Sequence, residues 1–133
     1  MLHMAGQEEA LPPNPDGSVR KFDPVAFATY MAEYCQFDKY LTPCAATNEA
    51  LAELKATGLK MVIFTNGPKK YALRVMEQLE ITPYFDSELI FAVEDVMPHC
   101  KPELEAFQKI FDATGVTDPS TSVMFEDSMK NIR

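Results

Sequence analysis

The sequence predicts an α/β fold with a parallel sheet, because three short apolar runs alternate with helical patterns. The runs lie at residues 61–64, 89–93 and 123–125, and their apolar residues follow one another without polar alternation. Such runs are typical of strands in parallel sheets, where both faces are covered. The order strand, helix, strand, helix, strand predicts right-handed crossovers within one sheet.

An arm, two helices and the connector between them are predicted before the first apolar run. Residues 1–21 combine glycines and prolines with polar side chains, so we expect a disordered arm. Asp23 and Pro24 then predict a helix start, as N-cap and first helical residue. Its inward stripe is expected to contain Val25, Phe27, Ala28, Met31, Tyr34 and Cys35. After a connector at 37–43, a second helix is expected over about 47–57, with Ala50, Leu51 and Leu54 inward and Gly58 as terminator.

Helices are also predicted after each of the first two runs. Pro68 opens one helix, whose inward residues recur at helical spacing as Ala72, Val75, Met76 and Leu79. Glu80 follows it, where a glycine would adopt the left-handed terminating geometry more easily. Lys101-Pro102 opens another, which Gly115 ends and whose inward residues are Leu104, Phe107, Ile110 and Phe111. Residues 128–133 begin a further helix after the third run.

The composition is acidic and suits one modest domain of 133 residues, with 12 basic and 20 acidic residues and a net charge of −8. This charge repels nucleic acid backbones and anionic membrane surfaces, so we expect neither as a partner. The three cysteines have no paired spacing, which fits reduced thiols in the cytoplasm. We expect no secretory signal and no transmembrane helix.

Polar residues follow the apolar runs at the edge where parallel strands end. They are Thr65, Asn66 and Gly67 after the first run, Lys101 in the loop after the second, and Glu126 and Asp127 after the third. Ligands of open α/β sheets bind at this edge, and the Gly-Pro entry into a helix adds backbone donors. A hydroxyl, a cation and two carboxylates suit magnesium-assisted phosphoryl transfer. Each residue also has a purely structural alternative, as a turn, a surface lysine or a helix cap.

These segments resemble the haloacid dehalogenase (HAD) superfamily of phosphatases, which use an aspartate nucleophile. Residues 62–67 (VIFTNG) look like its second motif, Lys101-Pro102 with the following helix like its third, and residues 123–128 (VMFEDS) like its fourth. The helix at 71–75 after Thr-Asn-Gly, and residues 127–132, are most similar to the pyrimidine 5'-nucleotidase branch. The resemblance implies a partial Rossmann-like core at 45–133 and part of a helical cap at 22–44.

The resemblance also implies a chemistry, the hydrolysis of a small phosphoester such as a pyrimidine nucleoside monophosphate through an aspartyl-phosphate. Thr65, Asn66 and Gly67 would bind the phosphoryl group, and Lys101 would stabilise its charge. Asp127, assisted by Glu126, would hold Mg²⁺. Cap residues would shape the choice of substrate, a small phosphorylated metabolite or nucleotide.

The first motif of the superfamily, a buried strand ending in Asp-x-Asp-x-Thr, is missing from the sequence. No aspartate is followed two places later by another, and the nearest echo, at Asp38, has Tyr40 in the second place. The covalent step then has no attacking group, so we expect the chain as written to be an inactive, truncated member. In the superfamily this strand lies between the strands that end at Thr65 and Asp127, so we also expect an open sheet edge that favours self-association.

Two other interpretations stay open. The chain could be a non-catalytic remnant of the fold that binds phosphate or a protein partner. It could also be a plain α/β interaction domain with coincidental motifs, in which case changes at Thr65, Lys101 and Asp127 would leave ligand binding unaffected.

Overall fold

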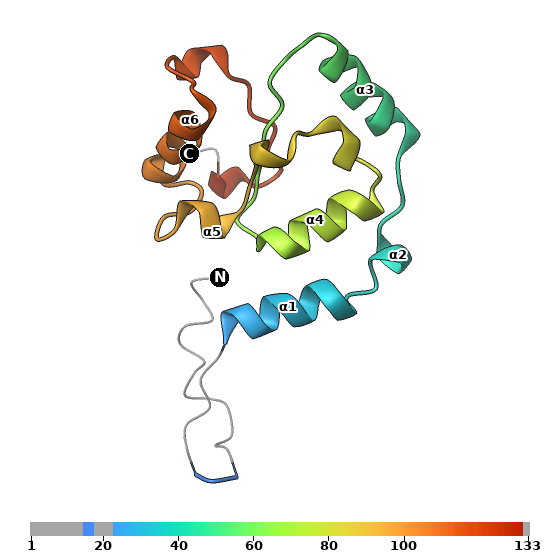
Figure 1. Cartoon of the computed structure of the whole chain (residues 1–133), viewed down its shortest axis with the longest axis vertical. Coiled ribbons are helices and arrows are strands. Elements are labelled where there is room, and N and C mark those ends of the chain that lie inside the picture. Colours follow the sequence, from blue (N-terminus) through green and yellow to red (C-terminus); the bar gives the residue numbers. More distant parts are fainter. Residues whose placement is uncertain (1–14, 18–22, 132–133) are drawn as a thin grey trace.

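The computed structural model describes residues 15–17 and 23–131. The longer elements are α1 (Pro24–Tyr34), α3 (Ala45–Ala56), β1 (Ile63–Phe64), α4 (Lys69–Gln78), β2 (Ile90–Phe91) and α6 (Leu104–Thr114). The shorter ones are α2 (Phe37–Tyr40), η2 (Thr82–Tyr84), η3 (Ser87–Leu89), α5 (Val93–Val96), η4 (Pro119–Thr121) and η5 (Met129–Asn131). Figure 1 shows α5 and α6 on one side of the central strands and α3 and α4 on the other.

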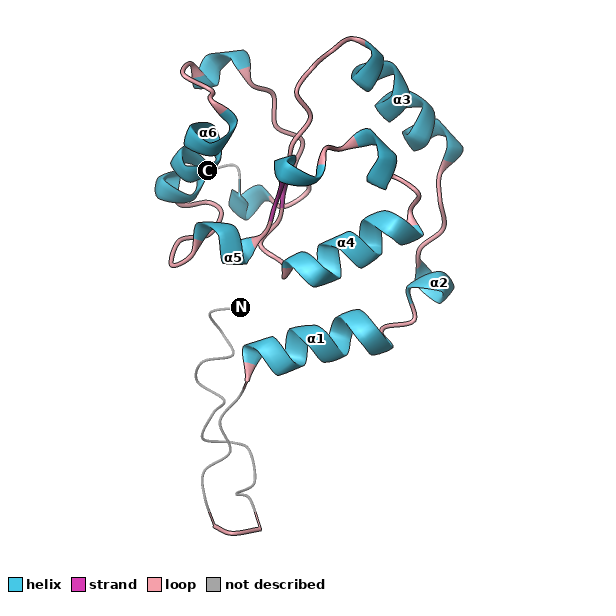
Figure 2. Ribbon diagram, viewed as in Figure 1, coloured by secondary structure: helices cyan, strands magenta, loops and turns pink. Residues whose placement is uncertain are grey.

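The sheet of the described residues consists of β1 and β2, which lie side by side near the centre of Figure 2. They are parallel, with Ile63 opposite Ile90 and Phe64 opposite Phe91. Helix α4 lies between them in the chain, so the predicted strand, helix, strand unit is confirmed. Both strands are shorter than the apolar runs that predicted them, since only residues with a paired neighbour form the ladder.

The core joins this sheet to α5 and α6. Val96, Ala106 and Ile110 form the buried cluster, against which Val62, Phe64 and Phe91 pack. The ring of Phe64 meets that of Phe107 edge to face, with centroids 5.5 Å apart. Burial of this kind stabilises a fold by roughly 1.5–3 kcal/mol for each large apolar side chain. The sheet is therefore held chiefly through the elements that follow β2.

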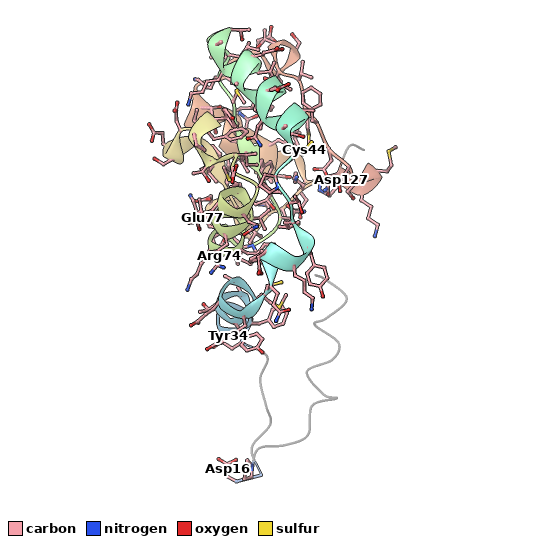
Figure 3. All side chains as sticks on the ribbon, turned by 90° about the vertical axis from the view of Figure 1, so that its right-hand side faces the viewer. Asp16, Tyr34, Cys44, Arg74, Glu77 and Asp127 are labelled. Atoms are coloured by element: carbon pink, nitrogen blue, oxygen red, sulfur yellow. The ribbon has the colours of Figure 1, made fainter. Side chains whose placement is uncertain are left out.

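The segment predicted as a cap portion packs on α4. Ala32 of α1 and Phe37 of α2 are buried, and the Phe37 ring meets the Tyr71 ring at a centroid distance of 5.1 Å. Figure 3 shows Tyr34 of α1 beneath Arg74 and Glu77 of α4. The expected connector at 37–43 contains α2 and reaches α4 directly, since the Gln78 side-chain amide donates to the Leu41 carbonyl oxygen at 3.2 Å.

Several predicted helix ends are confirmed, whereas two starts differ: α3 begins at Ala45 and not at about 47, and α6 begins at Leu104 and not at Lys101-Pro102. The Asp23 carboxylate accepts a hydrogen bond from the Ala26 N–H at 3.0 Å at the start of α1. Gly115 ends α6 with φ 71°, a left-handed conformation that glycine adopts without steric cost. Glu80 follows α4 with φ 58°, as expected from its place in the sequence, and it is the non-glycine residue with positive φ among those described. Here the chain uses a residue for which this conformation costs energy.

The third predicted strand, at 123–125, does not form. Val123 and Phe125 are 82% and 89% exposed, and the described residues offer them no paired neighbour. A segment forms a β-strand only when a neighbouring strand pairs with it through backbone hydrogen bonds, and the composition of the segment itself cannot provide that neighbour. The residues expected to start a helix at 128 form the short η5, and the last two residues lie outside the described part.

Several side chains predicted to face inward are exposed. On α1, Phe27 and Tyr34 are 44% and 61% exposed, and the buried residue among those described is Ala32. On α3, Ala50 and Leu54 are exposed, because this helix meets the rest of the described chain mainly at η2. Leu104 is 74% exposed, since α6 buries Ala106, Ile110 and Thr114, and two residues along a helix turn the side chain by about 200°.

The arm expected at 1–21 falls outside the described residues apart from 15–17. Within the described part, none of the helices has the length and apolar character needed to cross a bilayer.

Candidate active site

The turn Thr65-Asn66-Gly67 comes directly after β1, at the carboxyl end of the sheet. The Thr65 N–H donates to the Phe91 carbonyl oxygen at 3.0 Å, which places Thr65 at the last rung of the ladder. Its hydroxyl oxygen accepts a hydrogen bond from the Gly67 N–H at 2.9 Å. A Cβ at Gly67 would stand 3.3 Å from this oxygen, so glycine allows the close approach. The turn therefore holds the Thr65 hydroxyl at the strand end.

Asn66 joins this turn to the loop that carries Lys101. Its side-chain amide donates to the Lys101 carbonyl oxygen, and its side-chain oxygen accepts from the Lys101 N–H, both at 2.9 Å. The two residues are 35 positions apart, and this reciprocal pair fixes the loop against the strand end. Asn66, predicted to bind phosphate, has its amide group engaged in positioning Lys101.

Lys101 is a buried cation with two oxygen partners. Its side chain is 8% exposed, and its Nζ lies 2.8 Å from the Phe64 carbonyl oxygen and 2.5 Å from Glu126 Oε2. The same Nζ stands 5.2 Å from the centroid of the Phe64 ring. An ammonium group has three N–H donors, so these two hydrogen bonds leave one for a further acceptor. A buried charge requires such partners, because its desolvation is otherwise very costly.

Glu126 forms the ion pair with this lysine. Its Oε2 accepts from Lys101, and its Oε1 accepts from the Ser128 N–H at 3.0 Å. The hydrogen bond from Lys101, aided by that of Ser128 and opposed by desolvation, lowers the pKa of Glu126 to about 2. The carboxylate is therefore charged across the neutral range. Through it, the backbone at 126–128 is tied to the end of β1.

Thr65, Lys101, Glu126 and Asp127 line one open depression of about 800 Å³. Its other lining residues are Phe64, Asn66, Gly67, Phe125, Ser128 and Asn131. Asp127 is exposed and stands at the side of the molecule in Figure 3, beside η5. The predicted convergence of these polar residues is confirmed, whereas their chemical roles stay predictions.

Two backbone donors at the start of α4, the N–H groups of Gly67 and Lys69, are used within the protein. The Lys69 N–H donates to both carboxylate oxygens of Glu94, at 3.2 and 3.1 Å, and the Lys69 ammonium group pairs with Asp95. Glu94 thus takes the place at this helix terminus that an anionic ligand would occupy. The signal for this contact in the sequence is the acidic pair Glu94-Asp95 directly after the second apolar run.

Ser128 and Asn131 also line the depression, and sequence reasoning did not single them out. Both belong to the segment after Asp127, where a short polar helix start was expected. Their spacing of three residues places them on one side of a helical turn, which is the signal that could have found them.

A match to a family model agrees with this geometry. The model of the haloacid dehalogenase-like hydrolases matches residues 4–133. This chain belongs to the haloacid dehalogenase-like hydrolase family. The matched segment contains every residue of the depression, so the HAD-like assignment covers the site as well as the fold.

Two curated relatives are phosphatases by name. "Phosphorylated carbohydrates phosphatase" of Thermotoga maritima is 27% identical over 96 residues, which cover 72% of this chain and 43% of the relative. "Probable phosphoglycolate phosphatase" of Pseudomonas putida is 26% identical over 105 residues, which cover 79% and 40% respectively. The matched part is thus less than half the length of these HAD-like relatives. No solved structure matches the chain.

The donor set agrees in part with the Mg²⁺ that HAD-like hydrolases generally use. Mg²⁺ prefers oxygen ligands and is commonly held by one or two carboxylates together with water and substrate phosphate. Asp127 offers an exposed carboxylate at the rim of the depression. Both Glu126 oxygens accept hydrogen bonds from the protein, at Lys101 and at the Ser128 N–H, so its carboxylate has fewer lone pairs left for a metal ion.

Proposed function

We propose that this chain carries the phosphate-binding and metal-binding side of a phosphatase site. The substrate would be a small phosphoester such as a pyrimidine nucleoside monophosphate, hydrolysed with Mg²⁺ through an aspartyl-phosphate. The observation that supports this most directly is the buried Lys101, whose ammonium group lies between the end of β1 and Glu126, at the depression that Thr65 and Asp127 also line.

Each of these residues has a proposed role. The Thr65 hydroxyl donates to a phosphoryl oxygen, for which it is free to turn since it acts as acceptor toward Gly67. Lys101 uses its remaining N–H and its charge to stabilise the negative oxygens of the transferring group. Asp127 holds Mg²⁺, which would neutralise charge on the phosphate. Glu126 keeps Lys101 in place.

The covalent step needs a group that this sequence does not contain. An aspartate oxygen forms a bond to phosphorus while the ester P–O bond breaks, and water then hydrolyses the acyl phosphate to release inorganic phosphate. None of the aspartates stands in an Asp-x-Asp pair. We therefore propose that the chain alone binds ligand without turnover, and that catalysis requires a nucleophile from outside it.

The missing pair favours a second candidate function, a non-catalytic phosphate-binding or interaction domain of the HAD-like fold. For the chain alone both proposals expect no turnover, and they differ in whether a phosphoester is hydrolysed once a nucleophile is supplied from outside it. The acidic composition and the unpaired cysteines fit a cytoplasmic protein in either case.

The test combines turnover with binding. The 133-residue chain is incubated with Mg²⁺ and uridine monophosphate, cytidine monophosphate, phosphoglycolate or a sugar phosphate, and released phosphate is measured. Calorimetry with Mg²⁺ and inorganic phosphate then measures binding, with Lys101→Met and Asp127→Asn as variants and Lys70→Met as the exposed control. We expect no turnover and binding that both site variants weaken. Turnover that Asp127→Asn abolishes would contradict the proposal of an inactive chain, and binding unchanged in both variants would contradict the site itself.

A further inference from the structure

Three side chains that commonly bind metal ions gather where the Lys101 loop meets α6. His99 lies in the loop, Glu103 is the N-cap of α6, and Glu105 stands in the first turn of this helix. One ligand atom of each lies within 4.8 Å of the ligand atoms of the other two. We call these three residues the His99 cluster. None of them lines the depression of the candidate active site, so the cluster is a separate feature of the described chain.

Two backbone turns bring the cluster together. The His99 N–H donates to the Val96 carbonyl oxygen at 3.2 Å, and the Glu103 N–H donates to the Cys100 carbonyl oxygen at 2.8 Å. His99 Nδ1 then lies 2.8 Å from Glu103 Oε2, and the two side chains are 34% and 46% exposed. The ammonium group of Lys101, in the same loop, is buried at the end of β1. The loop therefore has a buried face that carries Lys101 and a solvent-accessible face that carries the cluster.

We propose that the His99 cluster binds a divalent transition metal ion of the Zn²⁺ type. One imidazole nitrogen and two carboxylate oxygens are ligands that Zn²⁺ accepts, at about 2.0–2.2 Å. In a tetrahedral site with such bond lengths, a nitrogen and an oxygen ligand stand roughly 3.3 Å apart. The pair of His99 Nδ1 and Glu103 Oε2 therefore has to open by only about 0.5 Å to admit the ion. The proposal does not depend on the proposed hydrolase function.

The donor atoms favour Zn²⁺ over the Mg²⁺ proposed for Asp127. Mg²⁺ prefers oxygen ligands in octahedral geometry, whereas imidazole and thiolate ligands select Zn²⁺ and similar ions. Besides the imidazole of His99, a thiol stands beside the cluster, since Cys100 Sγ lies 3.6 Å from Glu103 Oε1. Three protein ligands leave the fourth tetrahedral position for water or for the Cys100 thiolate. The two metal ions would thus occupy different sites in the same chain.

The cluster also has a purely structural explanation. Glu103 and Glu105 lie at the start of α6, where the helix dipole favours negative charge. His99 and Glu103 are four positions apart and form an ion pair when the imidazole is protonated. This explanation predicts that Zn²⁺ binds here no better than at any other exposed carboxylate, so a binding measurement separates it from the proposed metal site.

Calorimetry of the 133-residue chain with Zn²⁺ tests the proposal, in an excess of Mg²⁺ that occupies sites made of oxygen ligands alone. We expect one Zn²⁺ ion to bind per chain. His99→Ala should raise the dissociation constant by about a hundredfold or more, because the loss of a ligand should exceed the 10–100-fold effect of losing a group that only orients one. Glu105→Gln should raise it by about tenfold or more, since a neutral amide is a weaker ligand than a carboxylate.

Two matched controls remove the same chemical groups elsewhere in the chain. His3→Ala replaces the other histidine of the sequence, and Glu49→Gln replaces an exposed carboxylate of α3. Both should leave the dissociation constant unchanged, and circular dichroism verifies that every variant keeps its helical content. An unmodified chain that binds no Zn²⁺, or equal losses of binding in His99→Ala and His3→Ala, would overturn the proposal.

Co²⁺ in place of Zn²⁺ reports the geometry of the bound ion. Tetrahedral Co²⁺ absorbs visible light far more strongly than octahedral Co²⁺, because it has no centre of symmetry, so its spectrum distinguishes a zinc-type site from a magnesium-type one. We expect intense visible bands that Zn²⁺ displaces and that His99→Ala removes. Weak bands typical of an octahedral ion, or intense bands that persist in His99→Ala, would overturn the assignment of this cluster.

Discussion

The apolar runs 89–93 and 123–125 have similar composition and opposite surroundings. In the first, Ile90 and Ala92 are buried, and two residues pair with β1. In the second, Val123 and Phe125 are almost fully exposed and form no strand. The difference is a neighbouring strand: β2 pairs with β1, whereas no strand among the described residues pairs with the second run. Glu126, which follows that run, binds Lys101 at the end of β1. An apolar run becomes a strand where tertiary structure supplies both a ladder and a cover.

The largest expected effect is a difference in the free energy of unfolding between a truncation in the first run and one in the second. Ile90→Ala should lower the free energy of unfolding by about 3–4 kcal/mol, because it removes buried methyl groups and leaves a cavity. Val123→Ala should change it by less than about 0.5 kcal/mol, because the side chain is exposed. Urea denaturation followed by circular dichroism measures both. Equal losses in the two variants would mean that the second run is buried in solution.

The next effect concerns the ion pair that ties the second run to β1. Lys101→Met should cost about 2–3 kcal/mol, since it leaves the Glu126 carboxylate buried without its cation. Lys70→Met, at an exposed lysine of α4, should cost less than about 0.5 kcal/mol.

The double variant Lys101→Met/Glu126→Gln completes a cycle for this pair. It should be more stable than Lys101→Met alone, because no unpaired charge remains. Additive losses in urea denaturation would show that the two side chains do not interact, and the contrast between the runs would then need another cause.

Acid should break the same ion pair progressively, as Glu126 becomes protonated. The pKa of Glu126 is about 2 in the folded chain and 4.5 without its partners, so the charged form is favoured by folding. Its contribution is therefore fully present above pH 4.5 and is lost as the pH falls toward 2. Denaturation of the chain and of Glu126→Gln between pH 7 and pH 2 measures this, and the difference between them should shrink across that interval. A difference that stays constant down to pH 2 would contradict the ion pair.

The smallest expected effect concerns α4, the helix between the two paired strands. Glu80→Gly should raise the free energy of unfolding by about 1 kcal/mol, because φ is 58° at this position. Glu77→Gly, three residues earlier in the exposed helical part, should lower it by about 1 kcal/mol. Thermal denaturation of both variants measures the contrast, and a loss at both positions would contradict the left-handed conformation of Glu80.

Much of the local structure was predictable from single residues. Asp23 and Pro24 start α1, and Gly115 ends α6. The positive φ of Glu80 could be expected because this residue directly follows the last apolar position of a helical pattern. The site was predictable in outline, because Thr65, Lys101 and Asp127 come after successive apolar runs and strand ends gather at one edge. These inferences rest on local backbone preference and on the rules of chain connection, both of which the sequence expresses directly.

Other features depend on contacts between distant residues. The amide of Asn66 binds the backbone of Lys101 across 35 positions, and Glu94 occupies the start of α4. The exposure of Leu104 and Leu54 also follows from which elements face them in space.

The sequence by itself determined where helices start and stop and which polar residues follow apolar runs, because these depend on the conformation of a few adjacent residues. Tertiary structure alone decided which apolar run became a strand and which carboxylate was used to hold a lysine. The physical reason is that a ladder or a buried ion pair needs a second partner, and its free energy exists only once that partner is in place.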